Sequence, residues 1–227
     1  MTRRYRRWVA GTLLGAALAA ACSGNNKPVS GETASASARP EGNNAANNEA
    51  SSEAGNVDKR IQEEVAKRLD ASASEVEVTT FKEAEVPGMT VFRAYVPSPK
   101  AGRPGRFSYG VVKGNTIESD RKKATTMVLE AWNYGPGRTV PPERVALVLG
   151  VFEGGSREPA DALVTQAQVD AMSETQKKVI FLPREATVDG KPAVEYWATS
   201  GEVPLWKTTA VINPDRTVQT SREEFWD

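Results

Sequence analysis

The stretches "KEAEVPGMTVFRAYV" (residues 82–96) and "REATVDGKPAVEYWA" (residues 184–198) share a pattern that decides how this chain folds. At one constant offset a basic residue, a glutamate, an alanine, a valine and a glycine coincide. In each stretch the glycine, Gly88 or Gly190, precedes alternating apolar and polar residues, as in a strand entered from a turn. The sequence therefore predicts one small module written twice, with two independent hairpins of similar composition as the alternative.

The first copy belongs to a unit predicted to span residues 57–120. Apolar residues recur every four positions at its start, which predicts a helix with one apolar stripe. Three alternating segments follow and predict an antiparallel meander, with a tight turn at Gly114–Asn115. The proline- and glycine-rich stretch 97–106 is predicted to be a protruding loop. The stripe comprises Val57, Ile61, Val65 and Leu69, and the expected strands lie within 75–81, 89–96 and 106–117.

The second unit, residues 121–227, is predicted to begin with helices. The most distinctive is "PPERVALVLGVFEGG" (141–155), in which a proline suits the first turn and two glycines suit the end. Leu147 and Val151 leave its second side apolar as well, so we expect this helix at the centre of the domain. Its inward stripe comprises Val145, Val148, Leu149 and Phe152. Shorter helices are expected within 122–132 and 165–172, and strands within 177–188, 191–212 and 216–226.

A helix followed by an antiparallel meander, repeated once, predicts an α+β fold in which each sheet buries one face against helix. The element order and the turns Val86–Gly88 and Val188–Gly190 resemble those of the cystatin-like group. That group includes the inhibitory modules of secreted peptidase propeptides, and the first unit also resembles the dimerisation domain of periplasmic disulfide isomerases. The resemblance covers residues 57–120 and 160–222 and implies a topology, with no functional residue carried over.

The N-terminus predicts export and lipid attachment. A cationic start, "MTRRYRRW", and a short apolar run precede small residues, which is the order of a secretory signal over residues 1–21. The sequence "LAAAC" (18–22) resembles the lipobox of bacterial lipoproteins, although Ala19 stands where leucine is usual. The resemblance implies cleavage after Ala21 and lipidation of Cys22, whose acyl chains would anchor the protein in a membrane. Ser23 after the cysteine indicates the outer membrane of the cell envelope by the rule of that family.

Residues 22–56 are predicted to be a lipidated cysteine followed by a disordered linker. The stretch 23–56 holds no aromatic residue and is rich in Asn, Ser, Ala and Gly, so it cannot bury enough apolar surface to offset its ordering entropy. Removal of the signal takes away four arginines and leaves the mature chain with four more acidic than basic residues. That balance gives no electrostatic reason to expect a nucleic-acid partner.

The residue inventory limits the chemistry. The chain has no histidine and one cysteine, Cys22, so His-based catalytic arrangements and zinc sites of the usual His/Cys kind are excluded, and no cofactor is expected. Ser119 and Lys122 have the spacing of a serine–lysine nucleophile, but a helix capped by Ser119 or Asp120 explains them better. Two carboxylate pairs, Glu83/Glu85 and Glu223/Glu224, are candidates for acid–base work, with solvated strand edges as the simpler interpretation.

Aromatic residues beside turns and at the C-terminus offer a candidate binding surface, with packing in the core or in a lid as the simpler interpretation. These residues are Trp132, Tyr134, Phe225 and Trp226. Taken together, the sequence predicts a membrane-anchored, non-enzymatic lipoprotein that binds a protein, a peptide or an envelope polymer. Two alternatives stay open: a carboxylate-dependent hydrolase of envelope glycans or esters, and a peptidase-inhibitor-like module that uses the loop 97–106 as a wedge.

Overall fold

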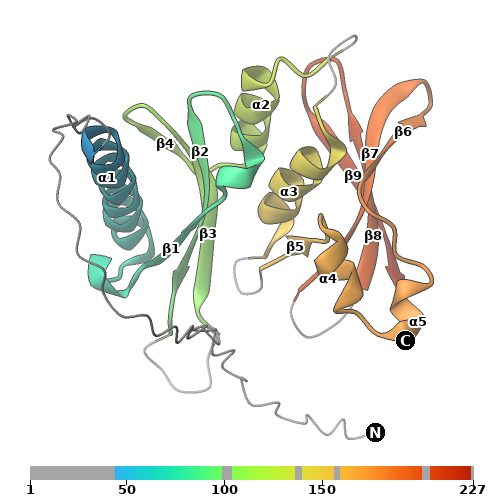
Figure 1. Cartoon of the computed structure of the whole chain (residues 1–227), viewed down its shortest axis with the longest axis horizontal. Helices are drawn as coiled ribbons and strands as arrows, with labels where there is room; N and C mark the ends of the chain where they lie inside the picture. The colour runs from blue at the N-terminus through green and yellow to red at the C-terminus, as the bar shows by residue number, and fades with distance from the viewer. Residues whose placement is uncertain (1–43, 99–103, 136–139, 156–158, 201–204, 226–227) are drawn as a thin grey trace, which may run out of the picture. The chain divides into compact units, whose positions relative to one another are not determined.

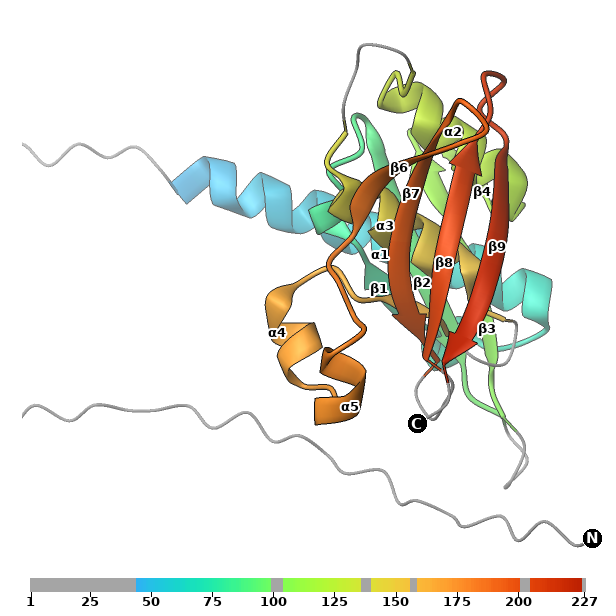
Figure 2. The ribbon, with the colours of Figure 1, turned by 90° about the vertical axis from the view of Figure 1, so that its right-hand side faces the viewer.

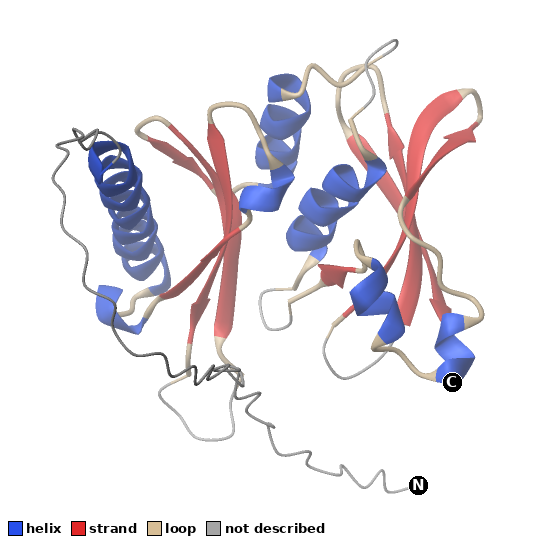
Figure 3. Cartoon of the chain, viewed as in Figure 1, coloured by secondary structure: helices blue, strands red, loops and turns tan. Residues whose placement is uncertain are grey.

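The computed structural model describes residues 44–98, 104–135, 140–155, 159–200 and 205–225. Asn43–Asp227 forms one compact unit. Within it, helices α2 (Arg121–Ala131) and α3 (Pro142–Glu153) lie between two antiparallel sheets (Figure 1). Helix α1 (Asn44–Leu69) packs on the other face of the first sheet. Helices packed on antiparallel sheets confirm the predicted α+β class (Figure 3).

The first sheet is covered on both faces. Because side chains alternate along a strand, Phe92 and Ala94 pack with α1, whereas Val91 packs in the cluster that contains α2 and α3. Helix α1 supplies Ile61 and Val65, which are completely buried. The described strands follow the order β1-β2-β3-β4. They are β1 (Glu77–Thr80), β2 (Met89–Val96), β3 (Arg106–Lys113) and β4 (Thr116–Glu118), and the short 3-10 turns η1 (Ala73–Glu75) and η2 (Lys82–Ala84) flank β1.

Helix α1 begins earlier than the sequence predicted. It starts at Asn44, so residues 44–56, which the sequence assigned to the linker, lie within this helix. Once Ile61 and Val65 are docked on the sheet, extending the helix backward requires no new nucleus, and the alanines of this segment have the highest helix propensity. The remainder of the predicted linker, the signal segment and Cys22 lie outside the described residues.

Helix α3 occupies the centre of the fold, as predicted. Val145, Val148, Leu149 and Phe152 are each at most 5% exposed. Pro142 occupies the first turn and Gly154 follows the last residue of the helix. Asp120 caps helix α2: its carboxylate accepts a hydrogen bond from the Lys123 backbone N–H at 3.0 Å, so the predicted cap is confirmed as Asp120.

The second sheet buries only its inner face fully. Val194, Tyr196 and Ala198 of one strand pack toward α3, whereas the outer face is covered at one end, where Phe181 packs on Trp197. Among the described residues β5 and β6 both pair with β7, which is followed by β8 and β9. The strands are β5 (Asp161–Ala162), β6 (Arg184–Val188), β7 (Lys191–Thr199), β8 (Leu205–Ile212) and β9 (Val218–Phe225); the short helices α4 (Gln166–Asp170) and α5 (Glu174–Lys177) precede β6.

One strand prediction is partly wrong. The segment 177–188 was expected to be a single strand, but β6 begins only at Arg184 and residue 177 ends helix α5. Ser173 and Gln176 form a capping box that starts α5, and Pro183 cannot donate a hydrogen bond to a strand partner. The predicted helix at 165–172 is confirmed as α4, with the capping box of Thr165 and Gln168.

The two sheets share their central pairing. Val91 lies opposite Val111 in the first sheet, and at the equivalent place Ala193 lies opposite Val211 in the second. Both meanders also run in the same order.

The turns into the central strands nevertheless differ. Asp189 and Gly190 both have positive φ, which allows a two-residue turn that closes the β6–β7 hairpin directly. Pro87 stands at the place of Asp189, and its ring fixes φ near −65°, so the first copy cannot form that turn. There β1 pairs farther up β2, and the turn η2 fills the gap. The duplication is therefore not confirmed.

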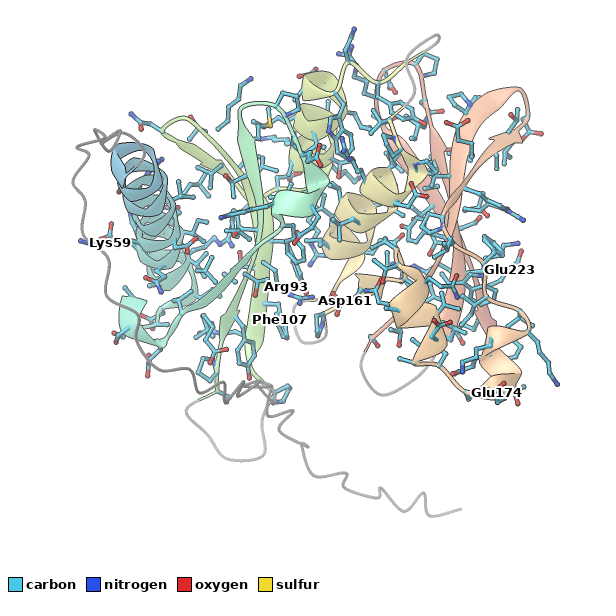
Figure 4. All side chains as sticks on the ribbon, viewed as in Figure 1. Lys59, Arg93, Phe107, Asp161, Glu174 and Glu223 are labelled. Atoms are coloured by element: carbon cyan, nitrogen blue, oxygen red, sulfur yellow. The ribbon has the colours of Figure 1, made fainter. Side chains whose placement is uncertain are left out.

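One hydrophobic core contains residues of both sheets, with Val91 and Val111 from the first and Tyr196 and Ala210 from the second. An ion pair adds to this connection, because Arg93 of β2 reaches the Asp161 carboxylate of β5 at 2.7 Å (Figure 4). The two meanders are thus held together through the layer of α2 and α3.

Candidate functional site

Strand β9 is the last strand of the second sheet (Figure 2). Two pockets border its inner face. Residues opposite each other in an antiparallel pair face the same side of the sheet. The β8 partners on this side are buried in the core, so the β9 residues opposite them point toward the layer of α2 and α3. These inward β9 residues are Val218, Thr220, Arg222 and Glu224.

The larger pocket, which we call the α2 pocket, has a volume of about 380 Å³ and lies between α2 and the first half of β9. Arg121 and Lys122 give it two cations, and Leu149 and Phe152 of α3 contribute apolar walls. The Arg121 guanidinium donates a hydrogen bond to the Phe152 carbonyl at 3.2 Å and lies 4.8 Å from the Tyr109 ring centroid. The cation is therefore held in place by α3 and β3.

The second pocket, which we call the Trp206 pocket, has a volume of about 310 Å³ and lies along the second half of β9. It is lined by two carboxylates, Glu153 and Glu224, and one cation, Arg222. The Arg222 guanidinium lies 5.2 Å from the ring centroid of Trp206. Ser200 adds a hydroxyl group to the lining. This end of β9 is therefore more acidic than the α2 pocket.

Glu153, the last residue of α3, lines both pockets and is the best candidate for a functional side chain. Its side chain is only 8% exposed, and its Oε2 atom lies 3.4 Å from both Arg222 Nη2 and Thr208 Oγ1. Burial raises the pKa of this carboxyl, and the charge of Arg222 opposes the rise without cancelling it. The position at a helix C-terminus also disfavours a negative charge.

Several polar atoms around Glu153 are buried without a hydrogen-bond partner among the described residues: Glu153 Oε1, the Tyr196 hydroxyl and Trp206 Nε1. The Tyr196 and Trp206 dipoles lower the Glu153 pKa but do not reach hydrogen-bonding geometry. A buried polar group left unpaired costs about 1–3 kcal/mol. Leaving these atoms unpaired therefore lowers stability at this place in the fold.

The outer edge of β9 is also free among the described residues, because β9 is the last strand of its sheet. From Gln219 to Glu224 every residue is exposed. An uncovered edge exposes backbone N–H and C=O groups that can pair with another extended chain. The edge of β9 and the two pockets, which both include Glu153 in their lining, lie along the same strand, and we call them together the β9 groove.

The structure does not bring the predicted aromatic residues together. Trp132 is buried in the core, and its Nε1 donates to the Glu85 carbonyl at 3.3 Å. Tyr134 packs partly buried against the same core, whereas Phe225 packs edge-on against Trp197 at 6.3 Å in a separate cluster. Trp226 lies outside the described residues. The core interpretation therefore applies to Trp132 and Tyr134, whereas Phe225 belongs to a separate packing cluster.

The predicted carboxylate pairs lie on the surface. Glu85 pairs with Arg144 at 2.6 Å, and Glu223 pairs with Lys207 at 3.4 Å. Sequence reasoning missed Glu153, although a signal was present: it is the acidic residue that closes the most apolar helix, directly before Gly154 and Gly155. An acid at the end of a buried helix has few routes to solvent.

Comparison of the chain with protein-family models, with curated proteins and with solved structures finds no match. Within the described residues, no group of three or more acidic, cysteine or histidine side chains is placed to hold a metal ion. In the same part of the chain, no helix is both long and apolar enough to cross a membrane. The loop 97–106, expected as an inhibitory wedge, includes residues 99–103, which lie outside the described residues.

Proposed function

We propose that this protein is a non-enzymatic lipoprotein of the cell envelope, anchored to the outer membrane through lipid on Cys22. In this proposal its compact unit binds a protein, a peptide or an envelope polymer along the β9 groove. The anchor part rests on the signal segment and the lipobox-like sequence "LAAAC". The binding part rests on the geometry of the second sheet.

The observation that supports binding is the exposed edge of β9 above two pockets. In the first sheet α1 covers one face, and α3 packs against the facing sides of both sheets. The inner side of β9, in contrast, faces two pockets, and Glu153 is part of the lining of each. Glu153 Oε1 and Trp206 Nε1, which belong to residues that line these pockets, are buried and have no hydrogen-bond partner in the described part of the chain. Free backbone groups at an edge and charged side chains that line adjacent pockets are features that an extended ligand contacts together.

Site-specific photocrosslinking in cells tests the binding part. A photoreactive residue replacing Thr220, which lines the α2 pocket, is expected to form adducts with an envelope component. The matched control carries the same residue at Gln166, which is exposed on α4 and outside both pockets. Adducts of equal yield at both positions, or none at Thr220, would contradict the proposal.

Membrane fractionation tests the anchor. Changing Cys22 to serine removes the thiol that would carry lipid, so the variant is expected to move from the membrane to the soluble envelope fraction. A variant that stays in the membrane fraction would contradict lipid anchoring.

A second candidate function is hydrolysis of an envelope glycan or ester with carboxylates alone. The favouring observation is that Glu153, with its raised pKa, and Glu224 line the same pocket. Turnover of a glycan or ester substrate, abolished by both Glu153→Gln and Glu224→Gln, would establish it. Retention of binding with no turnover by the wild-type protein would exclude it.

A further inference from the structure

The β9 groove has opposite charge character at its two ends. Lys122 and Arg121 lie in the α2 pocket, beside residues 217–220, whereas Glu224 lies in the Trp206 pocket with Glu153. Arg222 offsets one of these two carboxylates, so one negative charge is left at that end. A ligand that fits both ends therefore carries a cation at one end and an anion at the other.

The pairing of the sheets indicates the direction in which a strand would add. Every strand pair in the described part of the chain is antiparallel. A segment that continues the second sheet in this way runs opposite to β9, from the Trp206 pocket toward the α2 pocket. Its cationic side chain then precedes its anionic one in sequence.

The length of the β9 groove determines how many residues separate the two charged side chains of the ligand. Inward residues of β9 recur at every second position. Val218 and Thr220 line the α2 pocket, and Arg222 and Glu224 line the Trp206 pocket. Four residues of extended chain span about 13 Å, and residues four apart point to the same side. The two charged side chains of the ligand are thus about four positions apart.

We propose that the β9 groove binds an extended peptide segment of a partner protein, antiparallel to β9, with a lysine or arginine about four residues before an aspartate or glutamate. The basic side chain enters the Trp206 pocket, where Arg222 offsets the charge of Glu153 and Glu224 supplies the remaining negative charge. The acidic side chain pairs with Lys122. This specificity rests on the proposed binding function and adds to it the order and spacing of charges.

Fluorescence polarisation with synthetic peptides tests the proposal on the lipidated full-length protein in detergent. The probe is labelled Thr-Val-Lys-Thr-Val-Thr-Glu-Val-Thr, with blocked ends; a second peptide has lysine and glutamate exchanged, and a third has glutamine at both places. We expect the first to bind about ten-fold more tightly than the other two, with the difference shrinking as salt is raised. Equal affinities, or no binding of the first peptide, would overturn the proposal.

A charge exchange in the protein gives the sharper test. The double variant Lys122→Glu/Glu224→Lys reverses both ends of the groove, and both side chains are solvent-exposed, so the fold has little reason to change. We expect it to prefer the exchanged peptide. The matched control, Lys123→Glu/Glu223→Lys, makes the same charge changes one position away, outside both pockets, and should keep the wild-type preference. Failure of the preference to invert would overturn the proposal.

The two levels of the proposal fail in different ways. If Thr220 crosslinks to an envelope protein but the peptides bind equally well in either charge order, the binding function stands and this ligand is rejected. Crosslinks to a second copy of the chain, or to a polymer other than protein, would also reject it, because the groove would then have another occupant. Crosslinks to an envelope protein whose trapped peptide has the basic residue before the acidic one would support it.

Discussion

The two meanders have the same strand order but are covered differently. The first sheet is buried on one face by α1 and on the other by the layer of α2 and α3, so Val91 and Phe92, adjacent in sequence, are both almost fully buried. The second sheet has α3 on its inner face, whereas β9 is exposed along nearly its whole length. An additional helix thus accounts for much of the difference.

The difference indicates which part of the molecule is free to take on a function. A sheet with apolar cores on both faces contributes mainly to stability, because each inward side chain is already in contact with a helix. A sheet with one uncovered face and a free edge leaves backbone groups and polar side chains for a ligand. In this chain those groups coincide with Glu153, the most buried carboxylate that the pockets contain.

The largest effect is expected from the layer that both sheets share. Leu149→Ala should lower the free energy of unfolding by about 2–5 kcal/mol, because it removes buried methyl groups and leaves a cavity between the sheets. Thermal or denaturant unfolding followed by circular dichroism measures the change. Leu147→Ala on the same helix, at a partly buried position, should cost distinctly less. Equal unfolding of the two variants would contradict the central position of α3.

A smaller loss is expected from a change confined to the first sheet. At Gly110 of β3 a Cβ atom would lie 2.2 Å from the Glu118 carbonyl and 2.9 Å from the Phe92 ring, so Gly110→Ala should cost about 1–3 kcal/mol. In contrast, Gly55 has open space around it within α1, and Gly55→Ala should be neutral or slightly stabilising. Denaturant unfolding measures the change in the free energy of unfolding for both variants. An unchanged free energy of unfolding for Gly110→Ala would contradict tight packing around β3.

The third effect depends on pH and lies in the β9 groove. Burial raises the pKa of Glu153, so the folded state binds this proton more tightly than the unfolded state and stability falls as pH rises through the folded pKa. Glu153→Gln cannot ionise, so its stability relative to wild type should improve as pH rises through the raised pKa of Glu153, despite the loss of the pair with Arg222. Denaturant unfolding at several pH values measures this. The exposed control Glu64→Gln on α1 removes a carboxylate far from the groove, and identical profiles for both variants would contradict the expectation.

The smallest effect is expected on the outer face of the second sheet. There Glu195 accepts a hydrogen bond from Arg184 at 2.7 Å and lies 3.6 Å from Lys207, which also pairs with Glu223. The bond from Arg184 lowers the Glu195 pKa, so its contribution is present at neutral pH and is lost as pH falls through the lowered pKa. Glu195→Gln should cost up to about 1 kcal/mol at neutral pH and little under acid conditions. A cost that is unchanged by acid would contradict the ionic origin.

The sequence predicted those elements whose pattern is strong within a few residues. Three such patterns depend on local chemistry and are found at the expected places. They are the apolar stripe of α3, the capping box of Thr165 and Gln168, and the alternation of β2 and β7. Helix α5 was missed because the apolar run after it resembled a strand, although Ser173 and Gln176 carry the same capping spacing. The local signal was present, and the apolar run outweighed it.

The candidate site was harder to predict because it depends on tertiary contacts. Glu153, Trp206 and Arg222 are far apart in the sequence, and only the pairing of β8 with β9 brings the last two together. Likewise, nothing local distinguishes Trp132, which is buried, from an exposed ring beside a turn. Burial of a charge and the freedom of a sheet edge are properties of the assembled fold, so sequence pattern alone does not reveal them.

The neighbour-to-neighbour pairing of the first meander has a consequence for the order in which the chain folds. Its cluster with α1 uses only residues between Val57 and Ile117, and each strand pairs with the next one along the chain. Such local contacts close short loops and form quickly. Because synthesis starts at the N-terminus, this half of the chain can complete its own core before α3 has been made. The second meander then assembles on a surface that is already in place.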